Sequence, residues 1–261
     1  MSEATSQTLP DQTANLLLAL IFIGELKAGD KLPPERVLAQ TLDIDRTSLR
    51  SAIRTLISMN LVKSVQGSGI TVLNFKQNTD LTFIERLCQI DELVMSRDWI
   101  HSAFEFRITS VSSYLRAIAN VPMSPQKEEG IRLIKHQIKL ASEGAGAQKL
   151  AETEAQIQQY IASIGDNPLI ILQANSIRHL NLRLMTIMYE SINAKAYLKA
   201  QFKIVNKLLE GEISQENMEQ DLKELFQKQK VKVVKRISLL PEKSYLISSP
   251  LKHKPNLLSL G

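Results

Sequence analysis

The chain has 261 residues, of which 44% are apolar, and its 32 lysines and arginines exceed its 27 acidic residues by five. This apolar fraction excludes a disordered chain, and the length suits one large or two ordinary domains. The mild positive charge does not by itself indicate a nucleic-acid partner. Cys88 is the only cysteine, which excludes a disulfide framework and a cysteine-based zinc cluster.

We expect a cytoplasmic protein that does not enter a membrane. The first residues, MSEATSQTLPDQ, are polar and acidic, unlike a secretory signal. The strongest apolar run, residues 16–23, is too short to span a bilayer. We therefore interpret it as the buried part of a first helix over residues 11–26, preceded by a flexible tail at residues 1–10.

Residues 32–73 predict two short helices followed by a hairpin. Pro33 and Pro34 suit the start of the first helix, which has apolar residues along one side. Asp45 is placed to cap the second helix, residues 46–59, because its carboxylate can accept a backbone N–H that the first turn leaves unpaired. Four apolar residues at helical spacing give the second helix one buried face: Leu49, Ala52, Ile53 and Leu56.

The opposite face of the second helix carries the functional signal. Arg46, Arg50 and Arg54 repeat every four residues, and no acidic residue occurs between Arg46 and Thr79. Such a face fits the major groove of DNA, where guanidinium groups reach phosphates and guanine edges. The turn at residues 66–69 would then form a wing beside the phosphates. The alternative is a solvated arginine face on an ordinary helix, next to an ordinary hairpin.

The segments LPPERVLA at residues 32–39, DRTSLR at 45–50 and QGSG at 66–69 follow one another in this order. Together they resemble the winged helix-turn-helix of the GntR family of bacterial transcription regulators. The resemblance implies a homodimer on a palindromic DNA operator. It also implies the contacts with DNA: Arg36, Arg46 and Arg50 as the main arginines, Thr47 and Ser48 at phosphate, and Gln66, Gly67 and Ser68 of the wing in the minor groove. Asp45 departs from the serine or threonine that is common in the family.

After a polar segment at residues 74–80, which we predict to be a linker, the chain shows only helical periodicities. We therefore predict a mainly α protein, with a winged helix-turn-helix domain at residues 11–73 and an all-helical antiparallel bundle at residues 81–240. Residues 241–261 are expected to form a C-terminal tail. The bundle is predicted to contain seven helices, at residues 81–95, 99–119, 125–142, 147–164, 169–190, 194–209 and 214–237.

Nothing in the bundle indicates an enzyme. Its histidines are scattered, and the sequence has no phosphate-binding loop, nucleophile elbow or zinc-protease motif. We expect no catalytic residue and no cofactor.

The stretch from Glu154 to Ala162, followed by GDNPL at residues 165–169, resembles the effector domains of the FadR subfamily. In many of those domains an aspartate and three histidines bind a divalent metal that helps to hold a carboxylate effector. Here Glu154 keeps the acid, but Gln158 and Gln201 stand where the first two histidines are expected, and the last helix has no histidine. A carboxylate with two amides is a poor site for a transition metal, so we predict no metal.

The missing metal ligands are also a feature of the fatty-acid-responsive members of this subfamily, which bind long-chain acyl-CoA. By that resemblance, Arg107 would meet the coenzyme phosphates or a ligand carboxylate, with Phe104 beside the acyl chain. Arg107 has an alternative interpretation as the ion-pair partner of Glu105 or of another carboxylate.

The sequence as a whole predicts a transcription regulator whose affinity for its operator is controlled by a small-molecule effector, with long-chain acyl-CoA as the first choice. One alternative is a metal-independent regulator that responds to another organic acid. The other is a DNA-binding protein whose helical bundle binds a protein partner.

Overall fold

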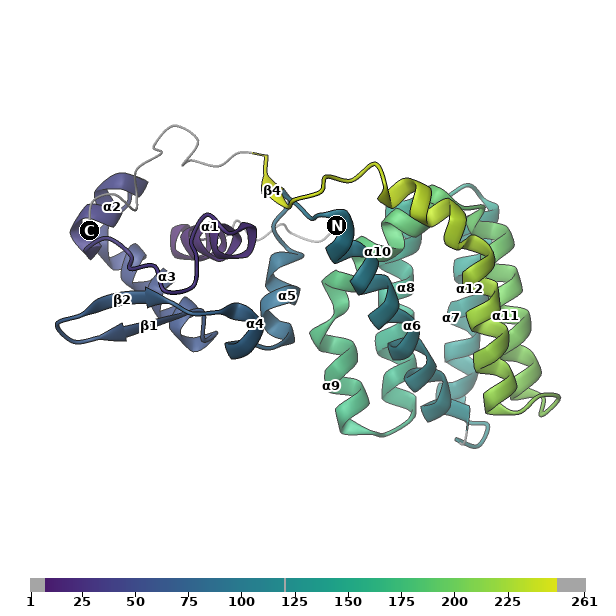
Figure 1. Cartoon of the computed structure of the whole chain (residues 1–261). Helices are drawn as coiled ribbons and strands as arrows, with labels where there is room; N and C mark the ends of the chain where they lie inside the picture. Colours follow the sequence, from purple (N-terminus) through teal and green to yellow (C-terminus); the bar gives the residue numbers. More distant parts are fainter. Residues whose placement is uncertain (1–7, 120, 248–261) are drawn as a thin grey trace. The chain divides into compact units, whose positions relative to one another are not determined.

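Twelve helices and four short strands are defined in the computed structural model, which describes residues 8–119 and 121–247. The described residues up to Val94, together with the segment that begins at Lys243, form one compact unit, and Met95–Glu242 form a second. Figure 1 shows the first unit as mixed helices and strands and the second as helices alone.

The first unit is built on the packing of α1 against α3. Thr8 caps α1, so the helix begins at Leu9 rather than at residue 11; the first seven residues of the tail that we expected lie outside the described residues. The side of α3 that faces the core buries the four apolar residues expected from their spacing. The elements of this part are α1 (Leu9–Ile23), α2 (Glu35–Leu42), α3 (Arg46–Ser58), β1 (Val62–Val65) and β2 (Gly69–Val72).

The segment predicted as a linker is instead part of the first unit. It contains the short helix α4 (Phe75–Asn78), and α5 (Leu81–Leu87) follows. The ring of Phe75 lies 6.1 Å from that of Phe22 and 5.0 Å from that of Phe83, measured between centroids. This aromatic cluster holds both helices against α1, so the unit ends at Val94 and not before residue 81.

A two-stranded pairing also corrects two sequence-based expectations. The helix predicted over residues 81–95 ends at Leu87, and β3 (Leu93–Val94) pairs antiparallel with β4 (Tyr245–Leu246). The start of the predicted C-terminal tail is therefore a strand. These strands of two residues have no periodicity of their own, because each is defined by a partner about 150 residues away.

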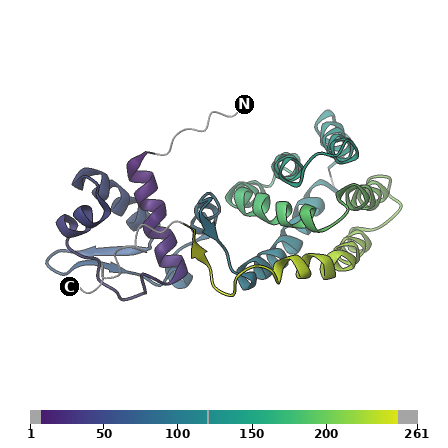
Figure 2. The same ribbon diagram turned by 90° about the horizontal axis from the view of Figure 1, so that it is seen from above.

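The second unit is an all-helical bundle in which α8 contacts α6, α7, α9 and α10. Figure 2 shows the bundle from above, with α12 running alongside α11. None of the helices in the described ranges is long and apolar enough to cross a membrane. The helices are α6 (Arg97–Ala119), α7 (Pro125–Ser142), α8 (Ala147–Ile164), α9 (Pro168–Ser176), α10 (Arg178–Ser191), α11 (Ala194–Leu209) and α12 (Gln215–Ile237).

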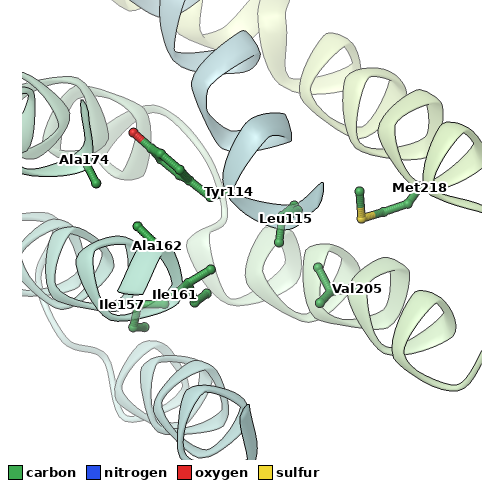
Figure 3. Close-up of a cluster of buried hydrophobic side chains, with 8 residues drawn as sticks. All are labelled: Tyr114, Leu115, Ile157, Ile161, Ala162, Ala174, Val205 and Met218. Carbon is green, nitrogen blue, oxygen red and sulfur yellow. The ribbon is translucent and has the colours of Figure 1, made fainter. Parts of the chain in front are cut away.

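Side chains from five helices meet in the core of the bundle (Figure 3). Tyr114, only 2% exposed, comes from α6 and reaches toward Ala174 of α9. The other members come from α6, α8, α11 and α12, so the core ties together elements far apart in sequence: Leu115, Ile157, Ile161, Ala162, Val205 and Met218.

One predicted helix is divided in two. The apolar pattern over residues 169–190 suggested one continuous helix, but the backbone leaves helical geometry at Ile177, where φ is −126° and ψ is 19°. Ile177 is 1% exposed, so the break is buried and packing fixes it rather than a local sequence signal.

Candidate nucleic-acid interface and ligand pocket

The N-terminus of α3 is held by Asp45. One carboxylate oxygen of Asp45 accepts the backbone N–H of Ser48 at 2.9 Å, and the other accepts the Ser48 hydroxyl. Hydrogen bonds from that hydroxyl, and then from the backbone N–H, hold the pKa of Asp45 below its usual value. The predicted cap is therefore present, and it is formed by the Asp45 carboxylate, which stands where a serine or threonine is common in the family. The Ser48 O–H is used in the hydrogen bond to Asp45, so only the oxygen lone pairs of this hydroxyl remain for other partners.

The arginines of α3 are exposed, as their spacing predicts. Arg50 differs from the others because its Nε donates to Glu35 Oε2 on α2 at 2.7 Å, and its side chain is still 55% exposed. Within residues 8–119 and 121–247, Arg36, Arg46 and Arg54 form no ion pair. This surface therefore offers three uncompensated guanidinium groups and a fourth that Glu35 orients.

The predicted wing is the antiparallel hairpin of β1 and β2. Ser68 N donates to Val65 O at 2.9 Å to close the turn, and Gly67 in that turn has a φ of 76°, a conformation that favours glycine. Gln66, Gly67 and Ser68 are all exposed. Lys31, bridged to the outer side of β2, reaches Ser68 Oγ with its Nζ at 3.3 Å. The tip of the hairpin is thus a small, ordered surface of amides, hydroxyl and ammonium groups, suited to phosphate.

Inside the helical unit, Arg107 on α6 is 6% exposed and forms an ion pair with Glu154 on α8. Arg107 Nη2 donates to Glu154 Oε1 at 2.9 Å, and Nη1 donates to Asn181 Oδ1 on α10 at 3.1 Å. Glu154 Oε2 accepts from Gln137 Nε2 at 2.9 Å and from the Tyr189 hydroxyl at 3.2 Å. The alternative interpretation of Arg107, as the partner of a carboxylate other than Glu105, agrees with this geometry.

Gln158 completes this arrangement from the position where a histidine ligand is expected in metal-binding relatives. Its Nε2 donates to Glu154 Oε1 at 3.1 Å, and its Oε1 accepts from Asn181 Nδ2 at 2.8 Å. The sequence analysis did not predict that Gln137, Asn181 and Tyr189 belong to a site. Their only signal in the sequence is a polar side chain on a helix face that is otherwise apolar. We call this set the Arg107–Glu154 network: Arg107, Gln137, Glu154, Gln158, Asn181 and Tyr189.

Two hollows lie against the network. The first is open to solvent and is lined by Arg107, Lys223 and Phe226 among others. The second has mainly apolar walls from α6, α7, α8 and α11, interrupted by the polar side chains of Gln137, Glu154, Gln158 and Gln201. Val111 and Gln201 line both. These hollows make the bundle a candidate ligand site.

Phe104 lies beside the first hollow rather than on its lining. It is 4% exposed, and its ring centroid is 6.0 Å from that of Phe226, which does line the hollow. Phe104 therefore supports the wall that Phe226 presents. Its predicted contact with an acyl chain stays a prediction.

The donors around the hollows suit organic groups better than a transition metal. Gln201 lines both hollows, and Gln158 is engaged in the network. In the part of the chain that the structure describes, no three His, Cys, Asp or Glu side chains gather as a metal site would require.

Several known proteins are similar to this chain in sequence. Residues 9–72 match the family described as "Bacterial regulatory proteins, gntR family". The "Fatty acid metabolism regulator protein" of Shewanella pealeana is 28% identical over 197 residues, which cover 72% of this chain and 75% of that protein. The HTH-type transcriptional regulator Mce2R of Mycobacterium tuberculosis is 30% identical over 87 residues, and this chain spans only 36% of its length.

The fold also matches a solved structure. Lar, described as controlling the expression of the Listeria monocytogenes agr system, superimposes with a TM-score of 0.58, covering 88% of this chain and 98% of the Lar chain. The sequences are 18% identical, so this likeness concerns the fold: an N-terminal winged helix-turn-helix followed by a helical domain.

Proposed function

We propose that this chain, whose residues 9–72 match the GntR family of bacterial regulatory proteins, is a DNA-binding transcription regulator of that family and that its helical unit senses a small molecule. The observation that carries the proposal is α3. Its exposed face presents Arg46 and Arg54 without ion-pair partners among the described residues, and Arg50 beside them, next to the ordered wing. An exposed helix with this charge supplies phosphate contacts and reads guanine edges.

We propose a homodimer as the DNA-binding species. A single α3 covers one half-site, and two copies about one helical turn of DNA apart would read a palindrome. A change in the separation of the two heads would then change affinity for the operator. Binding of the effector and of DNA must be coupled reciprocally in such a system.

The effector that we propose is long-chain acyl-CoA. Support comes from the Shewanella relative, because the similarity runs over 197 residues and so extends well beyond the 64-residue DNA-binding match. A second support is the pair of neighbouring hollows, both lined mainly by apolar surface, of which the first also carries the cations Arg107 and Lys223. A long acyl chain buries many methylenes at about 0.8 kcal/mol each, which offsets the ordering of a flexible ligand.

DNA binding is tested by fluorescence anisotropy at fixed salt, with an operator selected by the wild-type protein from random DNA. Arg46→Ala and Arg50→Ala should each weaken specific binding by about 1–3 kcal/mol if the lost contact is a bidentate guanine pair. Arg178→Ala is the matched control, since Arg178 is exposed on α10 of the other unit. Unchanged affinity in both α3 variants would contradict the assignment of α3.

The effector is tested on the same complex. Palmitoyl-CoA should release the labelled DNA and acetyl-CoA should not, because only the long chain can bury apolar surface against the walls of the second hollow. By reciprocity, saturating operator DNA should weaken palmitoyl-CoA binding by the same factor. Release by both thioesters, or by neither, would shift the proposal to another organic acid or to a protein-binding bundle.

A further inference from the structure

The charge of Arg107 is already used within the fold. Its guanidinium donates to Glu154 and Asn181, and both members of the ion pair have side chains only 7% exposed. An anionic ligand that took Arg107 as its main partner would leave Glu154 buried without a cation, which is strongly unfavourable. Arg107 can therefore contribute a wall and an N–H to the first hollow, but little free positive charge.

Lys223 on α12 is the other cation on the lining of the first hollow. Its side chain is exposed, and among the described residues it has neither a hydrogen-bond nor an ion-pair partner. A lysine ammonium on a flexible stem is a compact charge that can meet a carboxylate or a phosphate at the mouth of a pocket. The cost of desolvating it is small at that position, because the mouth is open to water.

An apolar path leads away from this charge. Val111 and Gln201 belong to the linings of both hollows, so the two are neighbours across these side chains. Beyond them, the second hollow presents a mainly apolar wall: Tyr114, Leu115, Ile134, Ile157, Ile161, Phe202 and Val205. A ligand with a charged head at Lys223 could thus bury an apolar chain without bringing a charge into the core.

We infer that Lys223, and not Arg107, receives the anionic head of the effector, and that the effector is an amphipathic anion with its chain directed toward the second hollow. This inference rests on the proposed sensing function and deepens it. It names the charge that selects the ligand class, and it assigns the Arg107–Glu154 network the task of shaping the wall rather than binding the anion. The head is either the carboxylate of a free fatty acid or the phosphates of its coenzyme thioester.

The test is titration calorimetry on the full chain at low and moderate salt, with four probes: palmitoyl-CoA, palmitate, hexadecanol and acetyl-CoA. Lys223→Gln should weaken binding of palmitoyl-CoA, of palmitate or of both about tenfold or more at low salt, with a smaller effect at higher salt. Hexadecanol, which has no charge, should bind the variant and the wild type equally. Acetyl-CoA should bind weakly to both, because it lacks the chain.

Lys230→Gln is the matched control, because Lys230 is an exposed lysine on the same helix and lies on neither hollow's lining. It should leave all four titrations unchanged. The two anionic probes separate the sources of the head: loss for palmitate alone identifies a carboxylate, and loss for palmitoyl-CoA alone identifies phosphate. Either result supports Lys223 as the receptor.

A second variant tests the rival cation. Glu154→Gln removes the counter-charge of Arg107 and keeps the side-chain shape, but it replaces one carboxylate oxygen, which accepts hydrogen bonds, with an amide NH2, which donates them. Unchanged binding of both anionic probes by Lys223→Gln would overturn the inference, and stronger anion binding by Glu154→Gln would then reinstate Arg107. If the wild type binds none of the probes, the proposed sensing function fails too. The two failures are thus distinguished by the wild-type titration itself.

Discussion

Arg107 is a cation inside the bundle, and its Nη2 lies 2.9 Å from Oε1 of its main partner, Glu154, on another helix. Removing one member of a buried ion pair costs about 3–5 kcal/mol, because the other is left without compensation. Arg107→Ala should therefore lower the free energy of unfolding of the helical unit by about that amount, measured by urea titration followed by circular dichroism.

The double variant Arg107→Ala with Glu154→Gln should recover part of the loss, since no uncompensated charge then remains buried. Arg132→Ala is the control: Arg132 also pairs with a carboxylate, Glu129, but on the surface, and little change is expected. Equal stability of Arg107→Ala and the wild type would refute a structural role for the pair. For the same reason, loss of ligand response in Arg107→Ala does not by itself identify a ligand contact.

Tyr114 gives a second prediction at the level of one residue. Its hydroxyl is buried and has no hydrogen-bond partner among the residues that the structure describes, and burial raises the pKa of Tyr114 to about 12. Tyr114→Phe removes a polar group that the fold leaves unsatisfied, so it should be neutral or stabilising at pH 7 in thermal unfolding. Clear destabilisation would show that the hydroxyl has a partner, such as an ordered water.

Because the pKa of Tyr114 is raised in the folded protein, the free energy of unfolding depends on pH in the alkaline range. The folded state holds the Tyr114 proton more tightly than the unfolded chain, where the pKa is near 10. The contribution that this tighter proton binding makes to the free energy of unfolding is therefore fully present below the unfolded pKa and is lost as the pH rises toward about 12. The difference in melting temperature between wild type and Tyr114→Phe should therefore shift in favour of the variant over this range.

At the scale of an element, α3 depends on Asp45 for its first turn. The lowered pKa of Asp45 means that the folded state favours the charged carboxylate. This stabilisation is present above the unfolded pKa, near 3.9, and is lost as the pH falls through the lower folded value. Asp45→Ala should reduce the melting temperature at pH 7, and the gap from wild type should close in acid. A gap that stays constant between pH 6 and pH 2 would contradict the cap.

Element boundaries could be predicted well where caps and periodicity agree. The bounds of α7, α8 and α11 were anticipated because Ser124 and Asn193 cap two of these helices and a glycine precedes the third. The pairing of β3 with β4 and the break at Ile177 could not be predicted from the sequence, because each depends on contacts with distant segments. The same limit applies to the Arg107–Glu154 network: its six members come from four helices, and only packing determines that they meet.

At the scale of the whole molecule, we expect a sensor that needs no metal. Gln158 binds Glu154 and Asn181, and Gln201 lines the hollows, so amides occupy positions where imidazoles would be required. Elemental analysis of the purified protein should find no stoichiometric zinc, nickel or manganese. A chelator should leave its melting temperature and operator affinity unchanged. About one tightly held transition metal per chain would refute this prediction.

The chain passes between the two units twice, once after Val94 and again before Lys243. The two passages are fastened at both ends. Ile247 N donates to Glu92 O at 2.9 Å in the first unit, and Arg97 N donates to Pro241 O at 3.0 Å in the second, where Arg97 also pairs with Glu242. A single protease cut after Val94 would therefore leave the two fragments associated without a covalent bond, through the pairing of β3 with β4 and the bond from Ile247 to Glu92, whereas a cut before Lys243 would leave the two units covalently joined.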